Sequence, residues 1–96
     1  LDFTDTAEVM EEELDMLLYP NPATDYLRVS FESEQERVLL VLFNAEGKVV
    51  QTIMDKNLPA GAHEVPIQVN HLTPGNYFVR LVCNGTRQKS KVFTKI

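Results

Sequence analysis

Residues 38–47 read VLLVLFNAEG, six apolar residues followed by a polar turn. An apolar run of this length suits a β-strand, whereas a helix that crosses a membrane needs about 20 apolar residues. Because both faces of the run are apolar, we expect it in the middle of a sheet. The turn over residues 44–47 ends in Gly47, where a hairpin favours a positive backbone dihedral φ. The sequence therefore predicts a central strand and an antiparallel return strand, residues 48–54.

The segments on either side of this hairpin also have the pattern of strands. Apolar and polar residues alternate over residues 27–31 and 63–69, as expected when one face of a strand is buried. Pro66 has no N–H to donate, so we expect its strand at the edge of a sheet. Three further strands are predicted at residues 15–19, 77–83 and 86–96. Asn84-Gly85 is expected to join the last two as a two-residue turn. About seven short strands separated by turns predict an all-β fold, an immunoglobulin-like antiparallel β-sandwich.

The 96-residue chain is long enough for one small domain, and its charge is unevenly spread. Residues 1–18 contain seven acidic side chains and no basic one, whereas residues 65–96 contain five basic side chains and no acidic one. We therefore expect an acidic linker over residues 1–14 and a folded domain over residues 15–96. The chain starts at Leu1 instead of Met, so we expect it to be part of a longer protein.

Few residues suit catalysis or metal binding. His63 and His71 have no metal-binding spacing, and a single cysteine cannot complete a zinc site. Cys83 shares the phase of the apolar residues in its strand, so we expect a core residue and not a reactive thiol. The alternating acids before the central strand are expected to form a solvated rim: Glu32, Glu34 and Glu36. We expect no enzymatic activity and no cofactor, and the net charge of -5 argues against a nucleic-acid partner.

The last predicted strand carries a row of basic side chains. Its basic residues and one phenylalanine are all odd-numbered, so in a regular strand they share one face: Arg87, Lys89, Lys91, Phe93 and Lys95. We expect this face to be exposed and to offer a chemically distinctive surface to a partner. A second interpretation is that the charges only protect an exposed edge strand from aggregation.

The turn motifs occur in an order that resembles a known family. Four of them precede the basic strand: residues 19–23 (YPNPA), Gly47 in the middle hairpin, residues 58–61 (LPAG) and residues 72–77 (LTPGNY). With the lysines that follow, this order resembles the C-terminal sorting domain of the type IX (Por) secretion system of Bacteroidota. The resemblance covers residues 17–96.

The resemblance implies an immunoglobulin-like sandwich at the end of a larger exported cargo protein. Cargo of this kind crosses the inner membrane by the general route and passes through the periplasm. The type IX translocon and its shuttle components then deliver it to the cell surface or the medium, without insertion of the domain into the membrane. In many members a sortase removes the domain and attaches the cargo to anionic lipopolysaccharide. By analogy the cut would fall before Tyr19, and Asp5-Thr6-Ala7 resembles the O-glycosylation motif of these bacteria.

The resemblance and the charge pattern together indicate candidate functional residues. Those expected to contact the translocon directly are Lys89, Lys91, Lys95 and Phe93. Those expected to carry the signal through turn geometry and packing are Pro20, Asn21, Pro22, Gly47, Gly61, Leu72, Gly75 and Tyr77.

Two other functions stay open on the sequence. One is an accessory binding module of a secreted enzyme or adhesin, which would hold a carbohydrate or a surface partner. It would need an exposed aromatic platform, yet Phe31 and Tyr77 have the phase of core residues. The other is a spacer without a recognition role, which would tolerate the loss of the basic row.

Overall fold

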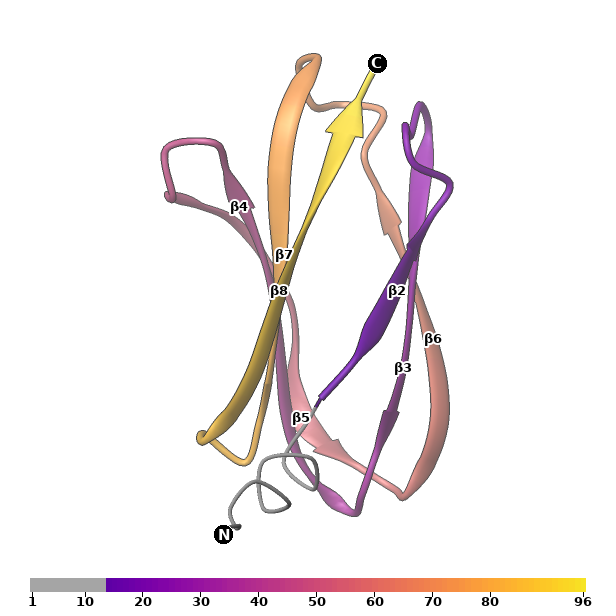
Figure 1. Cartoon of the computed structure of the whole chain (residues 1–96), viewed down its shortest axis with the longest axis vertical. Helices are drawn as coiled ribbons and strands as arrows, with labels where there is room; N and C mark the ends of the chain where they lie inside the picture. Colours follow the sequence, from indigo (N-terminus) through magenta and orange to yellow (C-terminus); the bar gives the residue numbers. More distant parts are fainter. Residues whose placement is uncertain (1–13) are drawn as a thin grey trace, which may run out of the picture.

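The structure, a computed structural model, describes residues 14–96, and these form seven strands and no helix (Figure 1). The strands are β2 (Met16–Tyr19), β3 (Tyr26–Ser33), β4 (Glu36–Asn44), β5 (Val49–Leu58), β6 (Gly61–Gln68), β7 (Gly75–Cys83) and β8 (Arg87–Lys95). Each predicted strand is present, and the predicted all-β class is confirmed.

Two antiparallel sheets pack face to face as an immunoglobulin-like sandwich (Figure 1). One sheet has the strand order β2-β3-β6, and the other has the order β5-β4-β7-β8. The apolar run over residues 38–43 lies in β4, between β5 and β7, as predicted. The edge position of β6 is also confirmed, with Pro66 opposite Arg28 of β3. The edge strands β5 and β6 follow each other in the chain and lie on one side of the sandwich. The other two edge strands, β2 and β8, lie on the opposite side.

The hairpin after β4 forms as predicted. Gly47 has a φ of 85°, and its N–H donates to the carbonyl oxygen of Asn44 at 2.9 Å. The side-chain oxygen of Asn44 accepts from the N–H groups of Glu46 at 3.0 Å and Lys48 at 2.9 Å. The return strand β5 extends beyond the predicted residue 54, to Leu58.

The turn between β7 and β8 is longer than predicted. Residues 84–86 separate the paired residues Cys83 and Arg87, so the expected two-residue turn is wrong. Asn84 and Gly85 do adopt positive φ values, of 58° and 75°. The Thr86 N–H closes the turn on the carbonyl oxygen of Cys83 at 3.2 Å, so pairing starts one residue later.

The core lies between the inner faces of the two sheets. Residues from β3, β4 and β7 fill it, and eight of them are fully buried: Leu27, Val29, Val38, Leu40, Leu42, Val79, Leu81 and Cys83. Burial of each aliphatic side chain of this size stabilises the fold by about 1.5–3 kcal/mol. The predicted core position of Cys83 is confirmed. Leu14 and Met16 are also buried, so the chain joins the core from Leu14 onward.

Candidate functional site

The basic row of β8 lies on the inner side of the larger sheet. Its four cations share one face with Phe93, as the alternation predicts, and Phe93 is fully buried. The Phe93 ring stacks on Tyr77 of β7, with ring centroids 5.7 Å apart. The predicted exposure is therefore wrong for Phe93, and for Lys95, which is only 8% exposed. The reason is that a pattern of alternation defines two faces but not which one faces the core.

The cations of this row differ in their partners. Lys91 Nζ lies 3.4 Å from Oδ1 of Asp15, the residue just before β2. Lys95 Nζ donates to the Ile96 carbonyl oxygen at 3.1 Å. Lys89 is half-buried and pairs with no carboxylate among residues 14–96. Lys89 and Lys91 are thus the cations of β8 that remain accessible at the edge of the sandwich.

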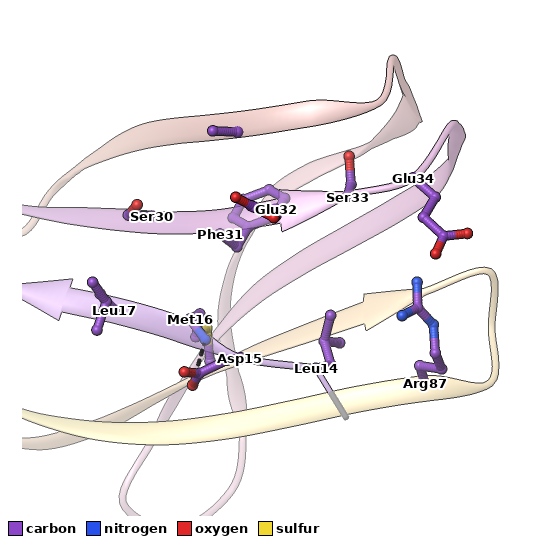
Figure 2. Close-up of a pocket in the computed structure, with 11 residues that line it drawn as sticks. Leu14, Asp15, Met16, Leu17, Ser30, Phe31, Glu32, Ser33, Glu34 and Arg87 are labelled. Atoms are coloured by element: carbon purple, nitrogen blue, oxygen red, sulfur yellow. Dashed lines mark hydrogen bonds between the residues drawn. The ribbon is translucent and has the colours of Figure 1, made fainter. Parts of the chain in front are cut away.

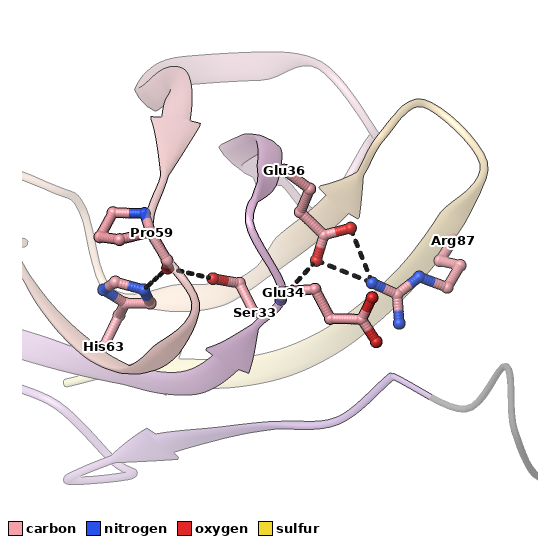
Figure 3. Close-up of polar contacts among 6 residues, drawn as sticks. All are labelled: Ser33, Glu34, Glu36, Pro59, His63 and Arg87. Carbon is pink, nitrogen blue, oxygen red and sulfur yellow. Dashed lines mark hydrogen bonds and ion pairs between the residues drawn. The ribbon is translucent and has the colours of Figure 1, made fainter.

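Arg87 forms a buried ion pair with Glu36 of β4 (Figure 3). One terminal nitrogen of its guanidinium donates to both carboxylate oxygens, at 2.8 and 2.7 Å. The Glu36 side chain is only 7% exposed, so its expected place in a solvated rim is wrong. Burial alone would raise the pKa of Glu36, but hydrogen bonds from Arg87 and the Glu34 N–H, with the charge of Arg87, keep that pKa below its usual value. The ion pair joins the first residue of β8 to the first residue of β4.

The turn over residues 20–23 is bound to the other end of β8. Asn21 Oδ1 accepts from the Thr94 N–H at 3.0 Å, and Asn21 Nδ2 donates to the Val92 carbonyl oxygen at 3.5 Å. The Ala23 N–H donates to the Thr94 carbonyl oxygen at 2.8 Å, and the Ala23 carbonyl accepts from the Ile96 N–H at 3.0 Å. We call residues 21–23 the clamp. It extends the sheet by a short parallel bridge and covers the edge of the last residues of β8.

The two prolines of the same turn suit this arrangement. The peptide bonds that precede Pro20 and Pro22 are both cis. Neither proline has an N–H, so the turn presents no unpaired donor at these positions while Asn21 and Ala23 make the contacts with β8. The YPNPA motif is therefore part of the same surface as the last strand.

The remaining motif residues lie at turns. Gly61 starts β6 with a φ of 132°, a conformation that residues with a Cβ rarely adopt, and Gly75 starts β7. The Leu72 side chain is in the core. The Tyr77 hydroxyl donates to the Thr73 carbonyl oxygen at 2.6 Å, so it fixes the turn before β7 while its ring supports Phe93.

A hollow of about 540 Å³ lies where the chain enters the sandwich (Figure 2). The first residues of β2, the end of β3 and Arg87 line it. Asp15 lies at this hollow, and its pKa is lowered by a hydrogen bond from the Met16 N–H and by Lys91. Ser33, at the end of β3, also lines this hollow and contacts the turn between β5 and β6. The Ser33 hydroxyl donates to the Pro59 carbonyl oxygen at 3.2 Å, and the His63 Nε2 lies 2.9 Å from it (Figure 3).

The described part of the chain holds no cluster of three or more His, Cys, Asp or Glu side chains arranged as metal ligands. Burial raises the pKa of the Cys83 thiol. Within residues 14–96 there is also no helix with the length and hydropathy needed to span a membrane.

A family model described as the secretion system C-terminal sorting domain matches residues 17–95. The match includes the clamp and nearly all of β2 to β8. The chain belongs to this family. The domain is thus a type IX secretion sorting signal for a larger protein that is exported to the cell surface or secreted, in a family that is generally non-catalytic. No curated protein matches the chain.

Two contacts of this sorting domain could not be found from its sequence. The Asn21–Thr94 and Glu36–Arg87 pairs join residues separated by 73 and 51 positions in the chain. Alternation along a strand carries no information about such partners, which depend on the strand order of the finished sandwich. The order of the family motifs was the available signal, because it placed the YPNPA turn and the basic strand in one unit without showing that they touch.

Proposed function

We propose that this sorting domain is the non-catalytic signal by which the type IX translocon and its shuttle components recognise the cargo protein on its N-terminal side. The observation that supports this is the joining of the clamp to β8, which brings the first and last family motifs into one surface. A partner that binds the folded domain can contact both motifs at once on this surface. A partner that recognised the motifs in an unfolded chain would not require the contacts between the clamp and β8.

Within this proposal, Lys89 and Lys91 contact the export machinery. Both are half-exposed at the edge of the sandwich, and Lys89 has no carboxylate partner in the described region. Phe93 and Lys95 act differently, because they are buried and hold β8 in position. The turn residues act in the same indirect way, through the shape of the loops: Pro20, Asn21, Pro22, Gly47, Gly61, Leu72, Gly75 and Tyr77.

The proposed route runs through the periplasm, where the domain folds, and across the outer membrane to the cell surface. A sortase then separates domain and cargo by a cut on the N-terminal side of Leu14. Leu14 and Met16 are part of the core, so a cut closer to Tyr19 would require the folded edge of the sandwich to open first. The acidic linker predicted over residues 1–14 lies almost wholly outside the described residues, as does the sequence Asp5-Thr6-Ala7.

The decisive experiment fuses residues 1–96 to the C-terminus of a periplasmic reporter in a bacterium with a working type IX system. We expect the reporter at the cell surface, and in the periplasm when the translocon is deleted. Removal of residues 92–96 should also leave it in the periplasm, because this deletion removes Phe93 and every partner of the clamp. A double Lys89→Gln/Lys91→Gln variant tests recognition without loss of the core. Periplasmic retention of the unmodified fusion would refute the proposal.

A second candidate function rests on the outer face of the larger sheet. Phe43, Phe78 and Arg80 line a hollow of about 250 Å³ there, and the Arg80 guanidinium lies 4.9 Å from the centre of the Phe43 ring. An accessory binding module would need an aromatic surface, and these two half-exposed rings support that candidate. Binding of the isolated 96-residue chain to a glycan array, lost in a Phe43→Ala/Phe78→Ala variant, would support that function.

A further inference from the structure

The outward edge of β8 is paired along only part of its length. In an antiparallel sheet, alternate residues of an edge strand direct both N–H and C=O away from their neighbour. Thr94 is such a residue, because both of its backbone groups contact the clamp. Residues of the same parity share its direction, so Gln88, Ser90 and Val92 also direct their backbone groups away from β7.

Most of these groups have no protein partner in the described region. The Val92 carbonyl oxygen accepts from Asn21, and from Thr94 onward the clamp continues the pairing. The N–H groups of Gln88, Ser90 and Val92 and the carbonyl groups of Gln88 and Ser90 have no backbone partner among residues 14–96. We call these groups the open edge. An exposed row of this kind is a template for an additional strand.

The side chains beside the open edge indicate the chemistry of that strand. Lys89 and Lys91 flank it on the inner face of the sheet, and Lys91 pairs with the carboxylate of Asp15, whose side chain is 73% exposed. On the outer face the edge presents Ser90 and Val92, and Val92 is 49% exposed. A strand that added here would place alternate residues opposite Lys89 and Lys91, and the intervening positions of the other face opposite Ser90 and Val92.

We propose that the open edge of β8 binds an extended acidic segment of a partner protein as an added β-strand. The segment carries carboxylates at alternate positions, for Lys89 and Lys91, and an apolar residue at the position opposite Val92. The clamp limits it to about five residues, because the sheet edge is already occupied from Thr94 onward. This inference rests on the proposed function, since it names the chemistry by which the export machinery would read the last strand.

Hydrogen exchange in the full 96-residue chain tests the edge directly. The amides of Gln88, Ser90 and Val92 should exchange quickly, and those of Lys89 and Lys91, which face β7, slowly. A synthetic heptapeptide of alternating Glu and Val should slow exchange at Ser90 and Val92, whereas a heptapeptide of alternating Lys and Val should not. Equal binding of the two peptides, or no protection by the Glu peptide, would overturn the proposal.

A pair of variants at one position separates backbone pairing from side-chain contact. Ser90→Pro removes the outward N–H, and this domain already tolerates a proline in its edge strand β6. It should weaken binding of the Glu peptide roughly threefold to tenfold, as expected for one lost backbone hydrogen bond. Ser90→Ala keeps the N–H and should bind as the unmodified chain does. Asp15→Asn should strengthen binding, because it removes the carboxylate that competes for Lys91.

The remaining outcomes also decide the question. Slow exchange at Ser90 in the chain alone would mean that the edge is already paired. If that protection falls on dilution, the partner is a second copy of the chain; if it persists, the pairing is internal. Both results would overturn the proposal. If the reporter fusion reaches the surface equally well with Ser90→Pro, the proposed function stands and the edge proposal falls. If the unmodified fusion fails to reach the surface, the proposed function itself falls.

Discussion

The two halves of β8 share one pattern of alternation but differ in what surrounds them. Over residues 88–91 the outward backbone groups have no partner in the described region, and the inner face carries the accessible Lys89 and Lys91. Over residues 92–95 the clamp contacts the Val92 carbonyl and both backbone groups of Thr94, and the inner face carries the buried Phe93 and Lys95. The second half therefore holds the strand in the fold, while the first half is available for recognition. Changes in the second half should lower stability, whereas changes at Lys89 and Lys91 should lower export with little loss of stability.

The largest effect is expected at the buried end. Phe93→Ala removes a fully buried ring that stacks on Tyr77. We expect it to lower the free energy of unfolding by about 3–5 kcal/mol, from lost burial and the cavity left behind. Urea denaturation of the 96-residue chain measures this value. Val92→Ala, at the neighbouring position that is 49% exposed, is the matched control and should cost less than about 0.5 kcal/mol. Similar losses in both variants would remove the distinction between the inner and outer faces.

The ion pair at the start of β8 should come next. Glu36→Gln leaves the partly buried Arg87 guanidinium without its carboxylate, and we expect a loss of about 1–3 kcal/mol at pH 7. Glu34→Gln is the matched control, because Glu34 is exposed and its side chain makes no ion pair in the described structure. Thermal denaturation of the two variants provides the comparison. An unchanged melting temperature in Glu36→Gln would show that the pair does not hold β8.

The same pair predicts a dependence on pH. The pKa of Glu36 is below its usual 4.5 in the folded domain, so the charged form is favoured by folding. This stabilisation is fully present above the usual pKa and is lost as the pH falls through the lower pKa of the folded state. The stability difference between the unmodified chain and Glu36→Gln should therefore shrink below about pH 4.5. Denaturation curves from pH 7 to pH 3 would contradict this if the difference stayed constant.

The clamp should have a smaller effect. Asn21→Ala removes the side chain that contacts the Thr94 N–H and the Val92 carbonyl oxygen, and we expect a loss of about 0.5–1.5 kcal/mol. Hydrogen exchange at the Thr94 amide should become faster at the same time. Asn70→Ala, at an exposed position, serves as the control for loss of an asparagine. Unchanged exchange at Thr94 would mean that Ala23 alone closes this edge.

The smallest effect on stability is expected at the accessible lysines. Lys89→Gln/Lys91→Gln removes one exposed ion pair and one cation without a partner in the described region, so the free energy of unfolding should change by less than about 0.5 kcal/mol. Surface delivery of the reporter fusion should nevertheless fall. Fractionation of cells that express the fusion measures both export and intact protein. Normal delivery would assign the recognition to another part of the domain.

Much of the fold follows from local sequence rules. The apolar run in β4 predicted an interior strand because both of its faces are apolar, and Pro66 predicted an edge strand because it cannot donate to a ladder. These inferences depend on neighbours in the chain and on the chemistry of single residues. For that reason they can be made without knowledge of the strand order.

The candidate site was harder to predict for the opposite reason. The basic residues of β8 were expected to face solvent because they are charged, but Phe93 and its contact with Tyr77 turn their face towards the core. At an edge strand the long stems of Lys89 and Lys91 can still reach water from an inner face, so charge alone does not identify the outer face. Glu36 was wrongly predicted to be solvated because its partner, Arg87, comes from a strand far along the chain.

The contact between the clamp and the last strand also fixes when folding can finish. Residues 21–23 are made early in synthesis, but their partners, Thr94 and Ile96, are made more than 70 residues later. A protein interrupted anywhere between these points lacks the strand that closes the sandwich. The finished fold is thus evidence that translation of the domain, and of any cargo before it, has run to completion. Machinery that accepts only the closed form would leave truncated products behind.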